Sequence, residues 1–260
     1  MNLDEYRQWL ILQTDTPKTQ KDYFKEVSFF LKYSNGEFNQ ELLNKFFVSR
    51  LEEGKSKNTF NKNINSLRNY ARFLKLNLEF PKYKTPDKRK KEFITYETMI
   101  EMKKNFVYIF DNYKKLELLF QFMFFTGLRA EEISELTNES FEWEQERLLV
   151  KNTKGKVDRY IPFMNKELFN EIKPIINEKG FDVSIELIVY YFKRIKEELN
   201  IKSKFHPHLM RVSFAKWSYK RGALSASIQS WLGHKNSSTT MSYIDVDEED
   251  HIKEWNKIKI

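Results

Sequence analysis

Residues 116–136 read LELLFQFMFFTGLRAEEISEL, and the expected centre of the fold lies in this stretch. The segment 116–125 is apolar on nearly every side, which is typical of a helix buried on all its faces. Thr126-Gly127 then interrupts the helix, because glycine readily adopts the left-handed conformation that ends helices. A second helix is predicted after this break, with Arg129 in its first turn, next to the hydrophobic core.

A short β-hairpin is predicted after this helical pair. The segments RLLVKN (147–152) and VDRYIPF (157–163) are rich in β-branched and aromatic residues and flank the glycine-containing turn TKGK (153–156). Helical patterns then return and continue to about residue 232. Residues 93–260 are therefore predicted to form an α+β domain with a small antiparallel sheet.

Residues 1–80 are predicted to form a small helical bundle, so the chain as a whole should be mainly α. Pro17 suits the first position of a helix, and the stretch 58–75 places its apolar residues on one stripe. Between the two parts, KYKTPDKRKK (82–91) has six basic residues and a proline, which disfavour both a helix and burial. We therefore predict a basic linker over residues 81–92.

Positive charge is concentrated in the first third of the chain. Residues 1–90 contain 18 Lys and Arg against 11 Asp and Glu, whereas residues 91–260 contain 27 against 26. This excess predicts contact with the phosphate backbone of a nucleic acid, and a solvated surface is the alternative. The candidate contact residues are Lys55, Lys57, Lys62, Arg68 and Arg72 in the bundle and Lys88, Arg89 and Lys90 in the linker.

Several classes of protein are disfavoured by what the sequence lacks. With no cysteine, the chain has no disulfide, thiolate metal site or cysteine nucleophile, and its four histidines show no HExxH spacing. We expect neither a metal nor a nucleotide cofactor, since a GxxxxGK[ST] segment is also missing. No apolar run is long enough for a membrane span and no secretory signal is evident, so we expect a soluble, cytoplasmic protein.

Four separate segments each contain a residue suited to chemistry on a phosphodiester. They are Arg129 in TGLRAEE, the pair His208 and Arg211 in HLMR, His234 in LGH, and Tyr243 in STTMSYIDV. An arginine can bind two phosphate oxygens at once, and residues three apart on a helix share one face. Each residue taken alone is more often a surface or packing residue, so the combination carries the hypothesis.

The motifs together resemble those of a known family. TGLRAEEI (126–133), TKGKVDRYIPF (153–163), HPHLMRVSFA (206–215), LGH (232–234) and TTMSY (239–243) occur in the order and contexts found in tyrosine recombinases, also called phage integrases, including the Xer type. They span the predicted second domain. The stretch SKNTFNKNINSLRNYARFLK (56–75) resembles, more weakly, the SAM-like helical core-binding domain of the same family.

The resemblance implies a set of catalytic residues. Arg129 and Arg211 match the two family arginines, His208 and His234 the two histidine positions, and Tyr243 the nucleophile. His206 is a rival to His208 but has no arginine three residues later. Val212, Lys216 and Trp217 depart from common family residues, although all three lie outside the reactive positions.

Two further assignments depend on the family pattern. In that pattern the hairpin lysine precedes a glycine and stands five residues before the arginine of an R-x-x-P strand, which selects Lys154 over Lys151 and leaves Lys156 as the fallback. Glu132 matches an acidic position whose expected role is to hold Arg129, and a plain helix-start carboxylate is the alternative.

The implied reaction is cleavage and rejoining of DNA strands at a specific site. Tyr243 would form a 3′-phosphotyrosine bond, so religation needs no cofactor. The resemblance further implies a homotetramer on double-stranded DNA, a Holliday junction, and in some cases accessory DNA-bending proteins. The tail after residue 250 would dock on a neighbouring protomer or fold back on its own domain.

Two other functions compete with the recombinase. One is strand relaxation of the type IB topoisomerase kind, against which the LGH-to-TTMSY spacing and the hairpin context argue. The other is a catalytically silent DNA-binding accessory protein, which would be expected to have lost a reactive residue, and none is missing from the sequence.

Overall fold

The chain forms two compact units, Met1–Lys88 and Arg89–Ile260. The computed structural model gives the backbone alone for Lys57, Asn58 and Ser238. It describes residues 3–14, 16–54, 57–82, 92–151, 158–234 and 237–244.

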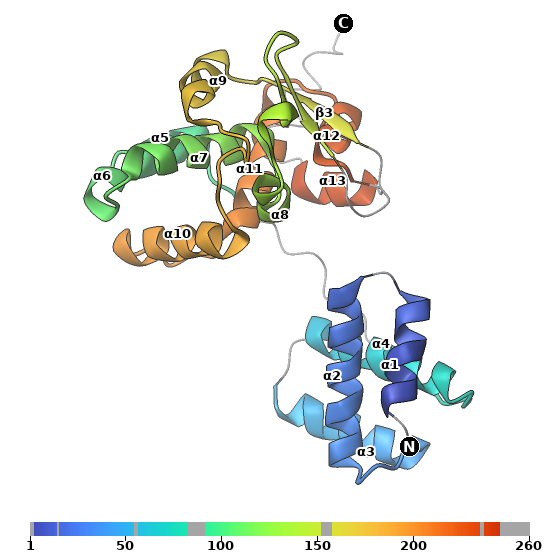
Figure 1. Ribbon diagram of the computed structural model, residues 1–260. Coiled ribbons are helices and arrows are strands. Elements are labelled where there is room, and N and C mark those ends of the chain that lie inside the picture. The colour runs from blue at the N-terminus through green and yellow to red at the C-terminus, as the bar shows by residue number, and fades with distance from the viewer. Residues whose placement is uncertain are drawn as a thin grey trace, which may run out of the picture. The chain divides into compact units, whose positions relative to one another are not determined.

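The first unit is a helical bundle, as the sequence predicts (Figure 1). Its helices are α1 (Leu3–Gln13), α2 (Pro17–Tyr33), α3 (Gln40–Glu52) and α4 (Lys57–Phe73). Aromatic rings fill its core: the ring centroid of Phe30 lies 5.2 Å from that of Phe38 and 5.1 Å from that of Phe46. On α4, Phe60, Ile64 and Leu67 are buried, so the predicted apolar stripe faces this core.

The second unit combines helices with a small antiparallel sheet, in agreement with the predicted fold class (Figure 1). Its first helices are α5 (Tyr96–Lys103), α6 (Phe106–Ile109), α7 (Tyr113–Thr126) and α8 (Ala130–Ser134). The short helix η1 (Asn138–Ser140) leads into β1 (Phe141–Glu142), β2 (Arg147–Val150) and β3 (Arg159–Pro162). There follow α9 (Lys166–Ile172), η2 (Lys173–Ile175), α10 (Ile185–Glu198), α11 (Pro207–Lys220), α12 (Ser225–Leu232) and α13 (Ser237–Ile244).

Helix α7 is the centre of this unit. Residues 118–126 are all buried, as the apolar run predicts. The helix ends at Gly127, whose φ of +62° is left-handed, and a Cβ atom there would lie 2.5 Å from Phe214 and 2.9 Å from Leu232. The close approach of α11 and α12 therefore requires glycine, and it brings three helices together at one point.

Arg129 lies slightly earlier than predicted relative to its helix. It is the N-cap residue of α8, in an extended conformation, rather than a member of the first helical turn. The Glu132 side chain accepts a hydrogen bond from the backbone N–H of Arg129, which explains why the helix starts one residue later.

The sheet has the order β1-β2-β3, and both pairings are antiparallel. In the predicted hairpin, Leu148 pairs with Ile161 and Val150 with Arg159. The strand β1 was not predicted, because a strand of two residues has no alternation to detect. Leu148, Val150 and Ile161 are buried, whereas Tyr160 is 44% exposed on the other face.

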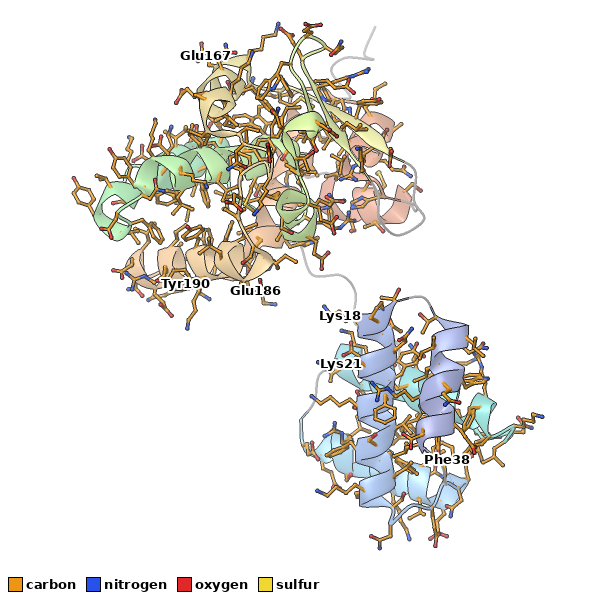
Figure 2. All side chains as sticks on the ribbon, viewed as in Figure 1. Lys18, Lys21, Phe38, Glu167, Glu186 and Tyr190 are labelled. Atoms are coloured by element: carbon orange, nitrogen blue, oxygen red, sulfur yellow. The ribbon has the colours of Figure 1, made fainter. Side chains whose placement is uncertain are left out.

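The last helices pack around α11. Tyr243 and Ile244 of α13 share a buried cluster with Phe214 of α11 and Leu232 of α12. On helix α10, the exposed side chains of Tyr190 and Glu186 project away from the core of this unit (Figure 2). The packing of α12 and α13 on α11 is what places Tyr243 beside the start of α11.

Candidate active site

The hydroxyl group of Tyr243 forms a hydrogen bond with His208. The phenolic oxygen lies 2.9 Å from Nε2 of His208, and the ring centroids are 5.7 Å apart with an edge-on geometry. Tyr243 is 5% exposed, whereas His208 is exposed at the start of α11. His206 only stacks on His208, with ring centroids 6.3 Å apart. The geometry therefore suits His208 to accept the phenolic proton.

His234 contacts Tyr243 as well. The two ring centroids lie 5.1 Å apart at an interplanar angle of 74°. Nδ1 of His234 lies 2.8 Å from the hydroxyl oxygen of Thr240, and Thr240 belongs to the same helix as Tyr243. This contact joins the turn after α12 to α13, so His234 and Tyr243 are held in one local frame.

Arg211 is fully buried, one helical turn after His208. Its Nη1 donates to the carbonyl of Gly127 at 2.8 Å, and its Nη2 donates to the carbonyl of Leu232. These carbonyls lie at the C-terminal ends of α7 and α12, where helices have unpaired acceptors and partial negative charge. Arg211 thus joins the two helix ends beside the tyrosine.

Glu132 is the acidic centre of the site, and its side chain is 12% exposed. Besides the Arg129 backbone contact, its carboxylate accepts from Nη1 of Arg129 at 2.8 Å and from Nη2 of Arg159 at 2.9 Å. Nη1 of Arg211 lies 3.9 Å away. The carboxylate therefore binds the Arg129 side chain, caps the start of α8 and also binds an arginine from β3.

Among the described residues of the site, guanidinium groups outnumber carboxylates, and their charges shift the pKa values of Glu132 and Arg211. Burial is the largest influence on the pKa of Glu132 and raises it, but the charge and hydrogen bond of Arg159, the Arg129 N–H and the charge of Arg211 together lower it below its usual value. Burial lowers the pKa of Arg211 to about 9, with the charges of Arg129 and Arg159 acting in the same direction. Among the described residues, one carboxylate faces three guanidinium groups, and this balance of charge favours the binding of an anion.

Arg159 is a site residue that the sequence did not single out. It is 6% exposed and, besides Glu132, its Nε donates to the carbonyl of Trp231 at 2.7 Å. In the sequence it is the arginine of the R-x-x-P pattern, which was used only as a reference point for choosing Lys154. An arginine at the start of a strand is usually a surface residue, so burial was not expected.

The fold brings most of the predicted catalytic set together. The contacts above form two groups, one of Arg129, Glu132 and Arg211 and one of His208, His234 and Tyr243. Arg211 joins them through its hydrogen bond to the carbonyl of Leu232, two residues before His234. Lys154 and its fallback Lys156 lie outside the described residues.

The predicted DNA-contacting residues lie partly on α4. Lys62 and Arg72 are exposed. Arg68 is half-buried, donates to Asn65 at 2.8 Å and lies over the ring of Phe80. The remaining candidates fall outside the described residues or side chains, namely Lys55, Lys57, Lys88, Arg89 and Lys90.

The described ranges contain neither a metal-binding cluster nor a membrane-spanning helix. Within them, no cluster of three His, Cys, Asp or Glu side chains is arranged to hold a metal ion. No described helix combines the length and apolar character that crossing a membrane requires.

Comparison with known proteins gives the family. A model of the phage integrase family matches residues 95–250, more than half of the chain. The chain belongs to the phage integrase family. This recombinase is 28% identical to tyrosine recombinase XerA of Thermococcus onnurineus, over 99% of the chain and 95% of the relative. It is 30% identical to tyrosine recombinase XerA of Pyrococcus horikoshii, over 97% and 91% of the two chains.

Solved structures share the fold of the recombinase. A Tn1549 transposon integrase in complex with circular intermediate DNA superimposes with a TM-score of 0.77 over the whole of both chains, at 17% identity. The XerA recombinase crystal structure gives a TM-score of 0.55 over 99% and 98% of the chains, also at 17% identity. The resemblance stated from the motifs is confirmed. The chain is a tyrosine recombinase, and the topoisomerase and inactive accessory alternatives are not favoured.

The Glu132 contacts predict a pH-dependent contribution to stability. Because the pKa of Glu132 is lowered in the folded protein, its contribution is fully present above the ordinary glutamate pKa and disappears as the pH falls through the lowered value. At pH 7, Glu132→Gln should lower the free energy of unfolding by about 3 kcal/mol, since it leaves buried guanidinium groups unbalanced. Urea denaturation followed by tryptophan fluorescence measures this difference, which should narrow below about pH 4.

A matched control is Glu142→Gln. Glu142 pairs with Arg147 at the edge of the same unit, and the Arg147 side chain is 41% exposed. Losing this pair should change the free energy of unfolding by no more than about 1 kcal/mol. Equal losses in the two variants, or a Glu132→Gln difference that persists unchanged into acid, would contradict the assignment of Glu132 as the buried counter-ion.

Proposed function

We propose that Tyr243 is the nucleophile of this recombinase and attacks a phosphodiester of double-stranded DNA at a specific recombination site. The observation that carries the proposal is the 2.9 Å hydrogen bond between the Tyr243 hydroxyl and His208. Solved structures with this fold support the choice of partner, since they include an integrase in complex with circular intermediate DNA and a lambda integrase dimer bound to a core site.

The reaction exchanges one phosphate ester for another. The Tyr243 oxygen forms a bond to phosphorus while its proton passes to His208, and the bond from phosphorus to the 5′ oxygen breaks. Lys154 donates a proton to that leaving oxygen. The product is a 3′-phosphotyrosine bond and a free 5′ hydroxyl, and the reverse steps with another 5′ end rejoin the strand. Because the ester bond is conserved, no cofactor is required.

Charge stabilisation is assigned to the arginines. The transition state carries extra negative charge on its non-bridging oxygens, and preorganised cations are the main means of stabilising it. The Arg129 side chain is 30% exposed and held by Glu132, while Arg211 is fully buried and its Nε has no hydrogen-bond partner among the described residues. His234 donates a hydrogen bond to a phosphate oxygen.

We assign DNA binding and catalysis to different parts of the chain. We assign residues 1–80 to a core-binding domain, 81–92 to a basic linker and 93–260 to the catalytic domain. The first contacts the phosphate backbone through Lys62, Arg68 and Arg72, and we assign the same role to the other predicted basic residues, which lie outside the described residues or side chains.

Recombination also requires assembly. Four protomers act on two duplexes through a Holliday junction, in the cytoplasm, with accessory DNA-bending proteins at some sites. The tail after residue 250 lies outside the described residues, and we assign it to contacts that assist this assembly.

Trapping of a covalent adduct tests the nucleophile. Sheared genomic DNA of the source organism is incubated with the protein, and sequencing the DNA of denaturant-resistant adducts identifies the site. A nicked duplex carrying that site then loses its 5′ fragment on cleavage and cannot be rejoined. Tyr243→Phe should form less than about one adduct for every thousand formed by the wild type, because it lacks the attacking oxygen.

The control for this experiment is Tyr113→Phe, which alters an exposed tyrosine at the start of α7. Its adduct yield should equal that of the wild type. Full adduct formation by Tyr243→Phe would refute the assignment, and so would the absence of adducts with the wild-type protein.

The proposed role of His208 as the base is tested by comparing substitutions of His208 and of its neighbour His206. His208→Ala should slow single-turnover cleavage about 100-fold at pH 7, because a positioned base contributes roughly this factor. His206→Ala removes the ring stacked on His208 and should cleave within about 3-fold of the wild type. A larger defect for His206→Ala than for His208→Ala would reverse the assignment.

A further inference from the structure

We infer that Arg159 is a positioning residue for strand cleavage, because it fastens the Glu132–Arg129 pair to the turn that carries His234. This inference rests on the proposed function of Tyr243 and its neighbours. It concerns a residue that touches none of the reacting atoms in the proposed mechanism. Its support comes from the partners of the guanidinium group, from its packing and from its burial.

The first contact is with the carboxylate that orients Arg129. Nη2 of Arg159 donates to Oε2 of Glu132 at 2.9 Å, while Oε1 of the same carboxylate accepts from the Arg129 side chain at 2.8 Å. Oε2 also accepts from the Arg129 backbone N–H at 2.9 Å. The carboxylate plane is thus fixed from two sides. If the Arg159 contact were lost, Glu132 would be oriented by Arg129 itself and by the longer 3.9 Å approach of Arg211, so the Arg129 guanidinium would be held less firmly.

The second contact is with the end of α12. Nε of Arg159 donates to the carbonyl of Trp231 at 2.7 Å, and Arg211 donates to the next carbonyl, that of Leu232. Two guanidinium groups therefore satisfy consecutive acceptors at a helix C-terminus, where positive charge is favoured. This end of α12 immediately precedes His234, so the arginine pair fixes the direction in which the chain leaves the helix.

The third contact is packing against Gly233. This residue has a φ of +63°, and a Cβ atom there would lie 3.1 Å from Cδ and 3.2 Å from Cζ of Arg159. A side chain at this position would be strained by the positive φ and would require the Arg159 side chain to shift by a few tenths of an ångström. The Arg159 side chain and the turn before His234 are therefore closely packed.

The stability of the fold is a weak explanation for a buried arginine at position 159. Arg159 is 6% exposed, and its Nη1 has no hydrogen-bond partner among the described residues. A buried charge with an unpaired N–H group is often no more stabilising than a well-packed apolar side chain. What the guanidinium provides that an apolar residue does not is a planar fork joining three segments, from β3, α8 and α12.

The test uses Arg159→Lys, which keeps the charge and loses the fork. On the nicked duplex carrying the recovered site, at saturating protein, its single-turnover cleavage rate should fall by about 10-fold to 100-fold, because small displacements of positioned groups have effects of this size. DNA affinity should stay within about 2-fold, since the proposed role leaves the phosphate-contacting surface intact. Arg159→Gln, which also loses the charge, should be slower still. Rates are measured at a temperature where circular dichroism shows every variant folded.

A double-mutant cycle with Glu132→Gln separates positioning from a general structural effect. Because Arg159 acts partly through Glu132, the double variant should be faster than the product of the two single effects predicts. The control is Arg147→Lys on β2, at the other end of the same strand ladder, which should cleave within about 2-fold of the wild type.

Three results would overturn the inference. They are a wild-type cleavage rate for Arg159→Lys, a rate loss explained entirely by a smaller folded fraction, and fully independent effects in the cycle. A wild-type protein that forms no adduct would instead contradict the proposed function, so the two failures can be told apart.

Discussion

A single buried carboxylate, that of Glu132, stands against three guanidinium groups, and the arrangement of the catalytic unit depends on it. Arg129 and Arg159 bind it directly, and Arg211 approaches to 3.9 Å. Buried charges are tolerated when they are paired and hydrogen-bonded. Among the described residues the pairing is incomplete, because three guanidinium groups face one carboxylate. In the proposed mechanism a phosphodiester would bring negative charge to this cluster, which would couple substrate binding to the electrostatics of the fold.

The helix ends around this cluster explain how it is held. Helices α7 and α12 both terminate at glycines in the left-handed conformation, and their last carbonyls accept hydrogen bonds from Arg211 and Arg159. Backbone atoms at helix ends therefore hold Arg211 and Arg159, in addition to the contacts that Arg159 and Arg129 make with Glu132. Preorganisation of this kind reduces the rearrangement required when charge develops in the transition state.

The sequence predicted those parts of the site that depend on local pattern. The apolar run before Gly127 and the hairpin around residues 153–156 have recognisable periodicity, and the ordered motifs identified Tyr243 and its partners. Arg159 was missed because its burial depends on the carbonyl of Trp231, 72 residues away, and on the bare backbone of Gly233. Helix α13 has a Ser- and Thr-rich sequence of weak helix propensity, so packing on α11 and α12 determines it.

The most direct measurement of the central claim is to locate the DNA on the protein. The adduct formed by the wild-type chain is digested with nuclease and trypsin, and the modified peptide is sequenced by mass spectrometry. Cleavage after Lys235 and Lys253 yields a peptide whose sole tyrosine is Tyr243. The account predicts a nucleotide joined through its 3′ phosphate to that tyrosine. A nucleotide on another peptide, or one joined through its 5′ phosphate, would contradict it.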